Sequence, residues 1–212
     1  MKHFNYCFIP DLPGDENLTG KLSHGIKLPG NIRFIGILSR FPKHRGLRKD
    51  HSGKIKYAVI LSGPEPQRKI LKQRLTEVLL RTGERTVMLE GEPSVEYCNK
   101  TNGNITFINH LPGYEMLELI LNTEIVIARS GYTSIMELAS IGKKAVLIPT
   151  PGQTEQEYLA NYLADKGWFV KLSQQECDKL QDINLPRHNL PDSISKESGW
   201  LLEKALSELL EE

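Results

Sequence analysis

The chain has 212 residues, of which 39% are hydrophobic and 25% are charged, an ordinary composition for a soluble domain. Its formal net charge of +1 provides no overall field that would select nucleic acid or a membrane surface, so we expect no nucleic-acid partner. Three scattered cysteines without a CxxC pair indicate a reducing compartment, and no apolar run reaches the ~18 residues of a membrane span.

The first fifty residues differ from the rest. Two short strand-like runs, residues 4–14 and 31–42, carry too little apolar material for a core of their own. Residues 40–56 (RFPKHRGLRKDHSGKIK) form a basic segment, which we interpret as a solvated connector, with contact to an anionic surface as the alternative. We predict that residues 1–50 are a linker-like extension and that residues 51–212 form the main domain.

From residue 54 onward, strand-like and helix-like segments alternate. Apolar runs predict six strands, at residues 54–63, 85–91, 104–110, 124–131, 144–151 and 168–173. Helical spacing predicts helices at residues 66–83, 116–123, 132–142, 155–167 and 198–212. This alternation predicts an α/β, doubly wound (Rossmann-like) parallel sheet of six strands with helices on both faces. Right-handed crossovers favour the strand order 3-2-1-4-5-6.

In that order the first and fourth strands are neighbours, and ligands of such sheets bind beyond the carboxyl ends at this point. The residues expected there are Ser62, Gly63, Arg129, Ser130, Gly131, Pro149 and Thr150. Glycine lets a ligand approach the backbone, and the start of the following helix attracts anions, so we expect a phosphate. An ordinary strand-to-helix turn capped by Ser130 is the alternative.

Two further polar residues lie near this edge. Arg68 is in the first turn of its helix, where the helix dipole disfavours a cation unless an anion is bound. Solvent exposure of Arg68 is the alternative. His110 follows the third strand, and the sequence alone favours a structural hydrogen bond over a ligand contact for it.

Capping patterns decide how two acidic segments are interpreted. Ser134 and Glu137 fit a capping box, but a helix that begins near Tyr132 places Ser134 too far inside to cap it. We therefore expect the Glu137 carboxylate to contact a ligand, where it could accept both hydroxyls of a ribose. Thr154 is the predicted cap of the next helix. Glu155 and Gln156 then project into the cleft toward sugar hydroxyls, with a plain surface role as the alternative.

Several motifs of catalysis and metal binding are missing. The sequence contains no DxD, P-loop, GxGxxG, HExxH or GxSxG, and its six histidines are scattered. We find no nucleophile–base pair, so the catalytic residues are unknown, and we predict no metal site and no cofactor. The pattern favours binding of a phosphorylated ligand over complete catalysis.

Residues 128–149 (ARSGYTSIMELASIGKKAVLIP) resemble the donor-binding segment of the GT-B glycosyltransferases of family 28, and the resemblance extends over about residues 54–175. The positions that match the family pattern are Arg129, Ser130, Gly131, Ser134, Glu137, Gly142, Lys144, Ala145, Pro149, Glu155 and Gln156. The resemblance implies a UDP-sugar donor, with the Ser-Gly turns near the diphosphate and Glu137 on the ribose. It also implies Met116 at the uracil pocket and Glu155 with Gln156 on the sugar. The chain departs from the family in a first loop poorer in glycine and in Leu159-Ala160, where Asn-Ala is usual.

GT-B enzymes have two such domains, and the amino-terminal one binds the acceptor and usually supplies the catalytic base. The resemblance covers only the carboxy-terminal domain. It implies the donor-binding half of an inverting, metal-independent glycosyltransferase that transfers a hexose or N-acetylhexosamine, incomplete by itself. The implied partners are an N-terminal acceptor domain or partner subunit and a lipid or saccharide acceptor. The resemblance implies a cytoplasmic location, with a peripheral position at the membrane as the alternative for the full-length enzyme.

Three alternatives stay open from the sequence: a subunit of a two-chain glycosyltransferase, a UDP-N-acetylhexosamine 2-epimerase-like enzyme, and a non-catalytic nucleotide-sugar-binding module. The linker-like start favours a fragment over a natural subunit. An epimerase needs several acid/base carboxylates and histidines around the cleft, which the sequence does not offer.

Overall fold

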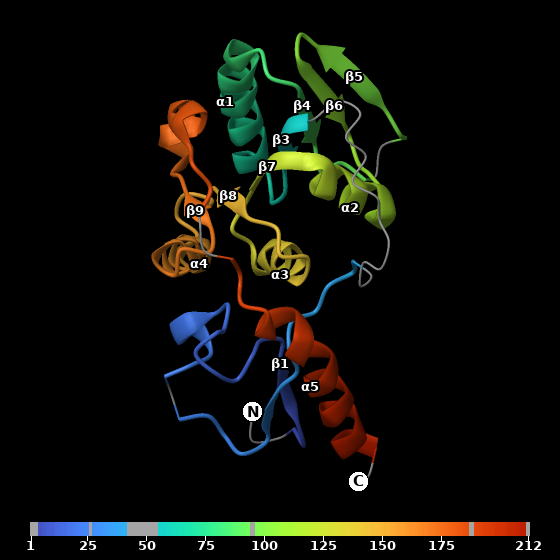
Figure 1. Ribbon diagram of the computed structural model, residues 1–212, viewed down its shortest axis with the longest axis vertical. Helices are drawn as coiled ribbons and strands as arrows, with labels where there is room; N and C mark the ends of the chain where they lie inside the picture. Colours follow the sequence, from blue (N-terminus) through green and yellow to red (C-terminus); the bar gives the residue numbers. More distant parts are fainter. Residues whose placement is uncertain (1–3, 26, 42–54, 94–95, 187–188, 211–212) are drawn as a thin grey trace.

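A computed structural model describes residues 4–25, 27–41, 55–93, 96–186 and 189–210. A sheet of seven strands dominates it, in the order β5-β6-β4-β3-β7-β8-β9 (Figure 1). The strands are β3 (Ile55–Ile60), β4 (Thr86–Leu89), β5 (Asn99–Asn102), β6 (Ile105–Ile108), β7 (Thr123–Ala128), β8 (Ala145–Leu147) and β9 (Val170–Lys171). The central strand β3 pairs in parallel with both β4 and β7.

The prediction of an all-parallel sheet of six strands is wrong in the number of strands and in the direction of one of them. β5 is an additional strand, antiparallel to β6 at the edge of the sheet, and all four of its residues are exposed. Its sequence, NKTN, has no apolar pattern, and therefore no signal marked it as a strand. The full strand order differs from the predicted one through β5, while the six expected segments keep their expected neighbours.

The central strands are apolar on both sides because the sheet is covered on both faces. The helix α1 (Gln67–Thr82) and the 3-10 helix η2 (Gln174–Asp182) cover one face, where Tyr57 and Val59 of β3 point. The helices α2 (Gly113–Asn122), α3 (Tyr132–Ser140) and α4 (Thr154–Asp165) cover the other face. Ala58 of β3 packs on this side of the sheet. Helices on both faces, as predicted, give an α/β Rossmann-like fold.

A second, smaller part of the molecule lies below the sheet in Figure 1. We call residues 4–25, 27–41 and 189–210 the small lobe, and residues 55–93 and 96–186 the sheet unit. The small lobe contains β1 (Cys7–Ile9) parallel to β2 (Ile32–Phe34), the 3-10 helix η1 (Gly20–Leu22) and the long helix α5 (Ser193–Leu210) (Figure 1). The lobe thus draws on both ends of the described chain, and the predicted division at residue 50 stays a prediction.

Helix boundaries confirm one capping prediction, correct another, and move the start of the last helix. α3 begins at Tyr132 with Gly131 as its N-cap, so Ser134 lies inside the helix as expected. The prediction that Thr154 caps α4 is wrong, because Thr154 is the first helical residue and Gln153 is the N-cap. α5 begins at Ser193, five residues before the expected start at residue 198.

Three further features bear on the sequence predictions: the basic connector, the cysteines and the character of the helices. Residues 42–54, which hold most of the basic connector, lie outside the described residues. Cys7, Cys98 and Cys177 are free thiols. Among the helices that the structure describes, none combines the length and the apolar character needed to cross a membrane.

Candidate functional site

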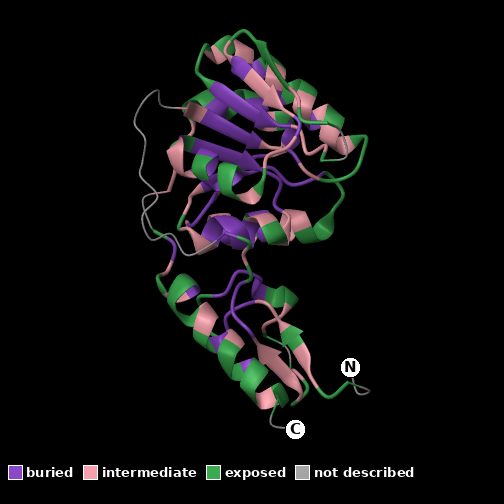
Figure 2. Cartoon of the chain, turned by 90° about the vertical axis from the view of Figure 1, so that its right-hand side faces the viewer, coloured by how far each residue is buried: buried purple, intermediate pink, exposed green. Residues whose placement is uncertain are grey.

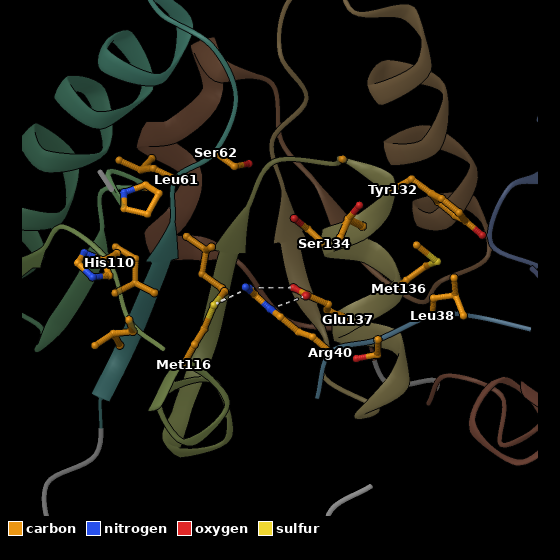
Figure 3. Close-up of a pocket in the computed structure, with 18 residues that line it drawn as sticks. Leu38, Arg40, Leu61, Ser62, His110, Met116, Tyr132, Ser134, Met136 and Glu137 are labelled. Atoms are coloured by element: carbon orange, nitrogen blue, oxygen red, sulfur yellow. Dashed lines mark hydrogen bonds and ion pairs between the residues drawn. The ribbon is translucent and has the colours of Figure 1, made fainter. Parts of the chain in front are cut away.

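A cavity of about 900 Å³ opens at the carboxyl ends of β3, β4 and β7, between the sheet and α3 (Figure 3). It lies at the edge of the sheet where the strand pattern predicted a ligand. The candidate residues in its wall are Ser62, His110, Met116, Gly131, Ser134 and Glu137. These residues come from four separate segments, so folding gathers at one cavity what is dispersed in the chain.

The start of α3 places the polar side chains of the cavity wall. Gly131 is extended and serves as the N-cap, and the chain turns there from β7 into the helix without a side-chain cap. The first backbone N–H groups of α3 thus lie beside the cavity, where the positive end of the helix dipole favours an anion. Ser134 and Glu137 are three residues apart and therefore share one face of α3.

Glu137 forms an ion pair in the cavity wall that the sequence did not reveal. Arg40 Nε lies 2.7 Å from Glu137 Oε1, and Arg40 Nη2 lies 3.0 Å from Met116 Sδ (Figure 3). The arginine thereby bridges the two residues expected at the ribose and the uracil. Burial raises the pKa of the Glu137 carboxyl, and the positive charge of Arg40 partly opposes this shift. Arg40 is 97 residues from Glu137 in sequence, and no local pattern signals the contact.

His110 contributes an unsatisfied polar atom to the cavity wall. Its Nδ1 atom is buried and makes no hydrogen bond, while its ring meets Tyr97 edge-on at 6.2 Å. The structural hydrogen bond favoured from the sequence is therefore absent at Nδ1 within the described residues. Buried polar atoms are nearly always hydrogen-bonded, so this atom is an exception in the cavity wall.

The remaining candidates do not line this cavity: Gly63, Arg68, Arg129, Ser130, Thr150, Glu155 and Gln156. Ser130 Oγ donates to the carbonyl of Gln156 at 2.8 Å, and the Thr150 N–H donates to Gln156 Oε1 at 3.0 Å. These bonds tie the start of α4 to the ends of β7 and β8. The roles of these residues as donor contacts stay predictions, and so does the role of the exposed Glu155.

Arg68 has protein partners instead of open solvent. Its guanidinium donates to the carbonyl of Gly91, lies 2.9 Å from Glu65 and lies 3.6 Å from Glu92. These carboxylates offset the charge that the helix dipole disfavours, so a bound anion is not required to explain Arg68.

Arg129 is buried, with 1% of its surface exposed. Its guanidinium donates to the carbonyls of Gln67, Ile148 and Pro149 and to Gln174 Oε1, at 2.7 to 3.3 Å. Burial lowers the pKa of Arg129 to about 10, which still leaves it charged at neutral pH. Arg129 therefore joins the start of α1 to the end of β8 and to η2.

Metal ligands are not clustered in the described part of the chain. No group of three or more His, Cys, Asp or Glu side chains there could hold a metal ion. The cavity wall offers a carboxylate, hydroxyls, an imidazole and helix N–H groups, which suit a ligand with hydroxyl and anionic groups.

The family model for the glycosyltransferase family 28 C-terminal domain matches residues 59–199. The chain belongs to this family. The family 28 match covers most of the sheet unit and reaches into α5. It includes the cavity-wall residues from Ile60 to Glu137, but not Leu38, Ser39 and Arg40.

Curated relatives of the family 28 domain share its sequence over part of their length. Two are UDP-N-acetylglucosamine–N-acetylmuramyl-(pentapeptide) pyrophosphoryl-undecaprenol N-acetylglucosamine transferases. The one from Pasteurella multocida is 28% identical over 60% of this chain and 38% of its own. The one from Prochlorococcus marinus is 31% identical over 57% of this chain and 34% of its own. The chain thus spans well under half the length of the curated relatives it matches.

Solved structures similar to the family 28 domain show the GT-B fold. MurG of Acinetobacter baumannii superposes with a TM-score of 0.53 at 16% identity, over 85% of this chain and 59% of its own. The kitacinnamycin glycotransferase superposes with a TM-score of 0.57 at 17% identity, over 85% of this chain and 49% of its own.

Proposed function

We propose that this chain is the donor-binding half of an inverting, metal-independent glycosyltransferase whose donor is a UDP-sugar carrying a hexose or N-acetylhexosamine. The observation that carries the proposal is the Glu137 carboxylate in the cavity wall of a family 28 domain. A buried carboxylate with one partly exposed partner is suited to accept both hydroxyls of a ribose. The curated relatives act with UDP-N-acetylglucosamine by their names, which supports this class of donor.

The start of α3 suits the leaving group of such a reaction. In inverting transfer the acceptor oxygen bonds to the anomeric carbon, the bond from that carbon to the diphosphate breaks, and the acceptor proton passes to a base. Negative charge develops on the diphosphate as it leaves. The N–H groups that follow Gly131 offer fixed dipoles to that charge without a metal ion.

The base and the acceptor site belong to a second half in this proposal, supplied in the same chain or by a partner subunit. Among the described residues of the cavity wall, the Glu137 carboxylate is assigned here to the ribose, and the Nδ1 atom of His110 has no orienting partner. A base must reach the acceptor hydroxyl by a hydrogen bond. The small lobe also exposes large apolar side chains, including Phe4 at 70% and Trp200 at 59%, which suit a covering partner. A lipid or saccharide is the proposed acceptor.

Calorimetric titration with UDP, GDP and their N-acetylhexosamine conjugates tests the donor. We expect UDP compounds to bind more tightly than GDP compounds, with or without EDTA. Glu137→Ala should weaken UDP binding about tenfold or more, because it removes a charged hydrogen-bond acceptor worth ~1.5–3 kcal/mol.

Glu124→Ala is the matched control for Glu137→Ala. Glu124 also pairs with a cation, Lys56 at 2.7 Å, but near the start of β7, at the opposite end of that strand from the cavity. It should leave UDP affinity unchanged. Loss of binding in EDTA would contradict the metal-free proposal, and unchanged affinity of a folded Glu137→Ala variant would contradict the ribose contact.

A further inference from the structure

Arg129 is a buried cation without a carboxylate partner. Nothing in the described chain forms an ion pair with it. Its guanidinium meets neutral oxygens only, and its Nε atom is buried without any hydrogen bond. Carbonyl groups solvate a guanidinium but do not cancel its charge, so a net positive charge stays in the interior.

The position of this charge connects it to the cavity. Arg129 directly follows β7, and two residues later Gly131 lines the cavity and starts α3. Arg129 also donates to the carbonyl of Gln67, the first residue of α1, which follows the turn that holds Ser62. The guanidinium is therefore attached to both strand-to-helix turns of the cavity, although Arg129 itself does not line the cavity, and in this sense it lies behind them.

A buried charge acts over a longer range than a surface charge. Water screens it weakly, and the protein around it has a low effective dielectric constant. A ligand with two or three negative charges in the neighbouring cavity gains from this field, whereas an uncharged ligand does not. The hydrogen bonds of Arg129 join three segments of the fold, but a neutral donor could make bonds of this kind without the cost of burying a charge.

We propose that Arg129 supplies the positive potential of the diphosphate subsite from behind the turns, without touching the donor. This inference rests on the proposed function, because it assumes that a nucleoside diphosphate occupies the cavity. Arg129 is then a positioning residue that also favours departure of the diphosphate. It differs from Arg68, whose charge is already paired with Glu65 and Glu92.

The test is the ratio of UDP affinity to uridine affinity, measured by NMR titration. Uridine binding reports the nucleoside contacts and the integrity of the fold, and the ratio reports the field on the diphosphate. In Arg129→Gln the ratio should fall about tenfold relative to the unmodified chain, while uridine affinity stays within about twofold. Arg129→Lys keeps a positive charge and should retain the ratio within about threefold.

Arg81→Gln is the matched control, because it removes an arginine of α1 that already pairs with a carboxylate, Asp178, in the last turn of the helix and away from the cavity. It should leave the ratio within about twofold. An unchanged ratio in Arg129→Gln would overturn the inference, and so would an equal fall in Arg129→Lys or in Arg81→Gln. If Arg129→Gln does not fold, the neutral variant Arg129→Met takes its place in the same comparison. Failure of the unmodified chain to prefer UDP over uridine would instead overturn the proposed function.

Discussion

The sheet unit and the small lobe bury their apolar side chains to very different degrees. In the sheet unit, layers of helices cover both faces of the strands, and the buried residues concentrate there (Figure 2). Apart from Tyr97 and Tyr114, every exposed large apolar residue in the described chain lies in the small lobe: Phe4, Phe8, Leu22, Leu38, Trp200, Leu206, Leu209 and Leu210.

This difference shows that the small lobe depends on other surfaces. A two-stranded parallel sheet such as β1–β2 does not hold its shape alone, because it has two open edges and few side chains to pack. The lobe is fixed to the sheet unit by Leu12, Leu18, Ile37 and Leu201, which join the core on the side of α2, α3 and α4. The Tyr132 hydroxyl donates to the carbonyl of Pro10, and Lys21 N donates to the Tyr158 hydroxyl at 2.6 Å.

The largest expected effect compares one leucine from each region. Leu75→Ala, in the fully buried face of α1, should lower the free energy of unfolding by about 2–5 kcal/mol, since it leaves a cavity in a packed core. Leu209→Ala, at 43% exposure in α5, should cost less than about 1 kcal/mol. Urea unfolding followed by circular dichroism measures both. Equal costs would show that the exposed face of α5 is already covered in solution.

A smaller effect is expected where α5 meets the strand segment of the small lobe. Gly36 has φ +71°, and a Cβ there would lie 2.3 Å from Ser198 Cα, so Gly36→Ala should cost roughly 2–3 kcal/mol. The Ile37 N–H donates to Ser198 Oγ at 3.0 Å in the same contact. Hydrogen exchange should rise in α5 and not in α1. Gly30→Ala, with no heavy atom within 4 Å of its Cβ, is the control. Faster exchange throughout would mean that lobe and sheet unit open together.

The smallest effect concerns the point where the small lobe reaches the cavity. A ribose must compete with Arg40 for Glu137, and a partly exposed ion pair is worth at most about 1 kcal/mol. Arg40→Ala should therefore raise uridine affinity about threefold in an NMR titration. Arg33→Ala, which removes an ion pair to Glu208 within the small lobe, should change nothing. Weaker uridine binding by Arg40→Ala would identify Arg40 as a nucleoside contact.

Segments with a strong local signal were predictable from the sequence. The apolar runs of β3, β4, β6, β7 and β8 and the turns at Ser62 and Gly131 placed the cavity at the correct edge of the sheet. The 3-10 helix η2 gave no such signal, since its sequence QQECDKLQD is mostly polar. The start of α5 was missed for the same reason, because SISKE has a single apolar residue.

The fine structure of the site depended on contacts between distant segments. Arg129 was expected near the donor because it ends the fourth predicted strand and matches the family pattern, yet three backbone carbonyls from other segments hold it in the interior. Arg40 was assigned to the basic connector and not to the site, since its contact with Glu137 joins residues 97 positions apart. Local patterns locate the ends of strands but do not determine which side chains face the cavity.

The added strand β5 has a consequence for how copies of the chain meet each other. Edge strands expose unpaired backbone groups, which invite another chain to extend the ladder. At one end of the large sheet β5 presents only exposed polar side chains, including Lys100, and at the other end β9 is two residues long. Neither end offers a long apolar template, which protects this sheet against edge-to-edge growth of aggregates.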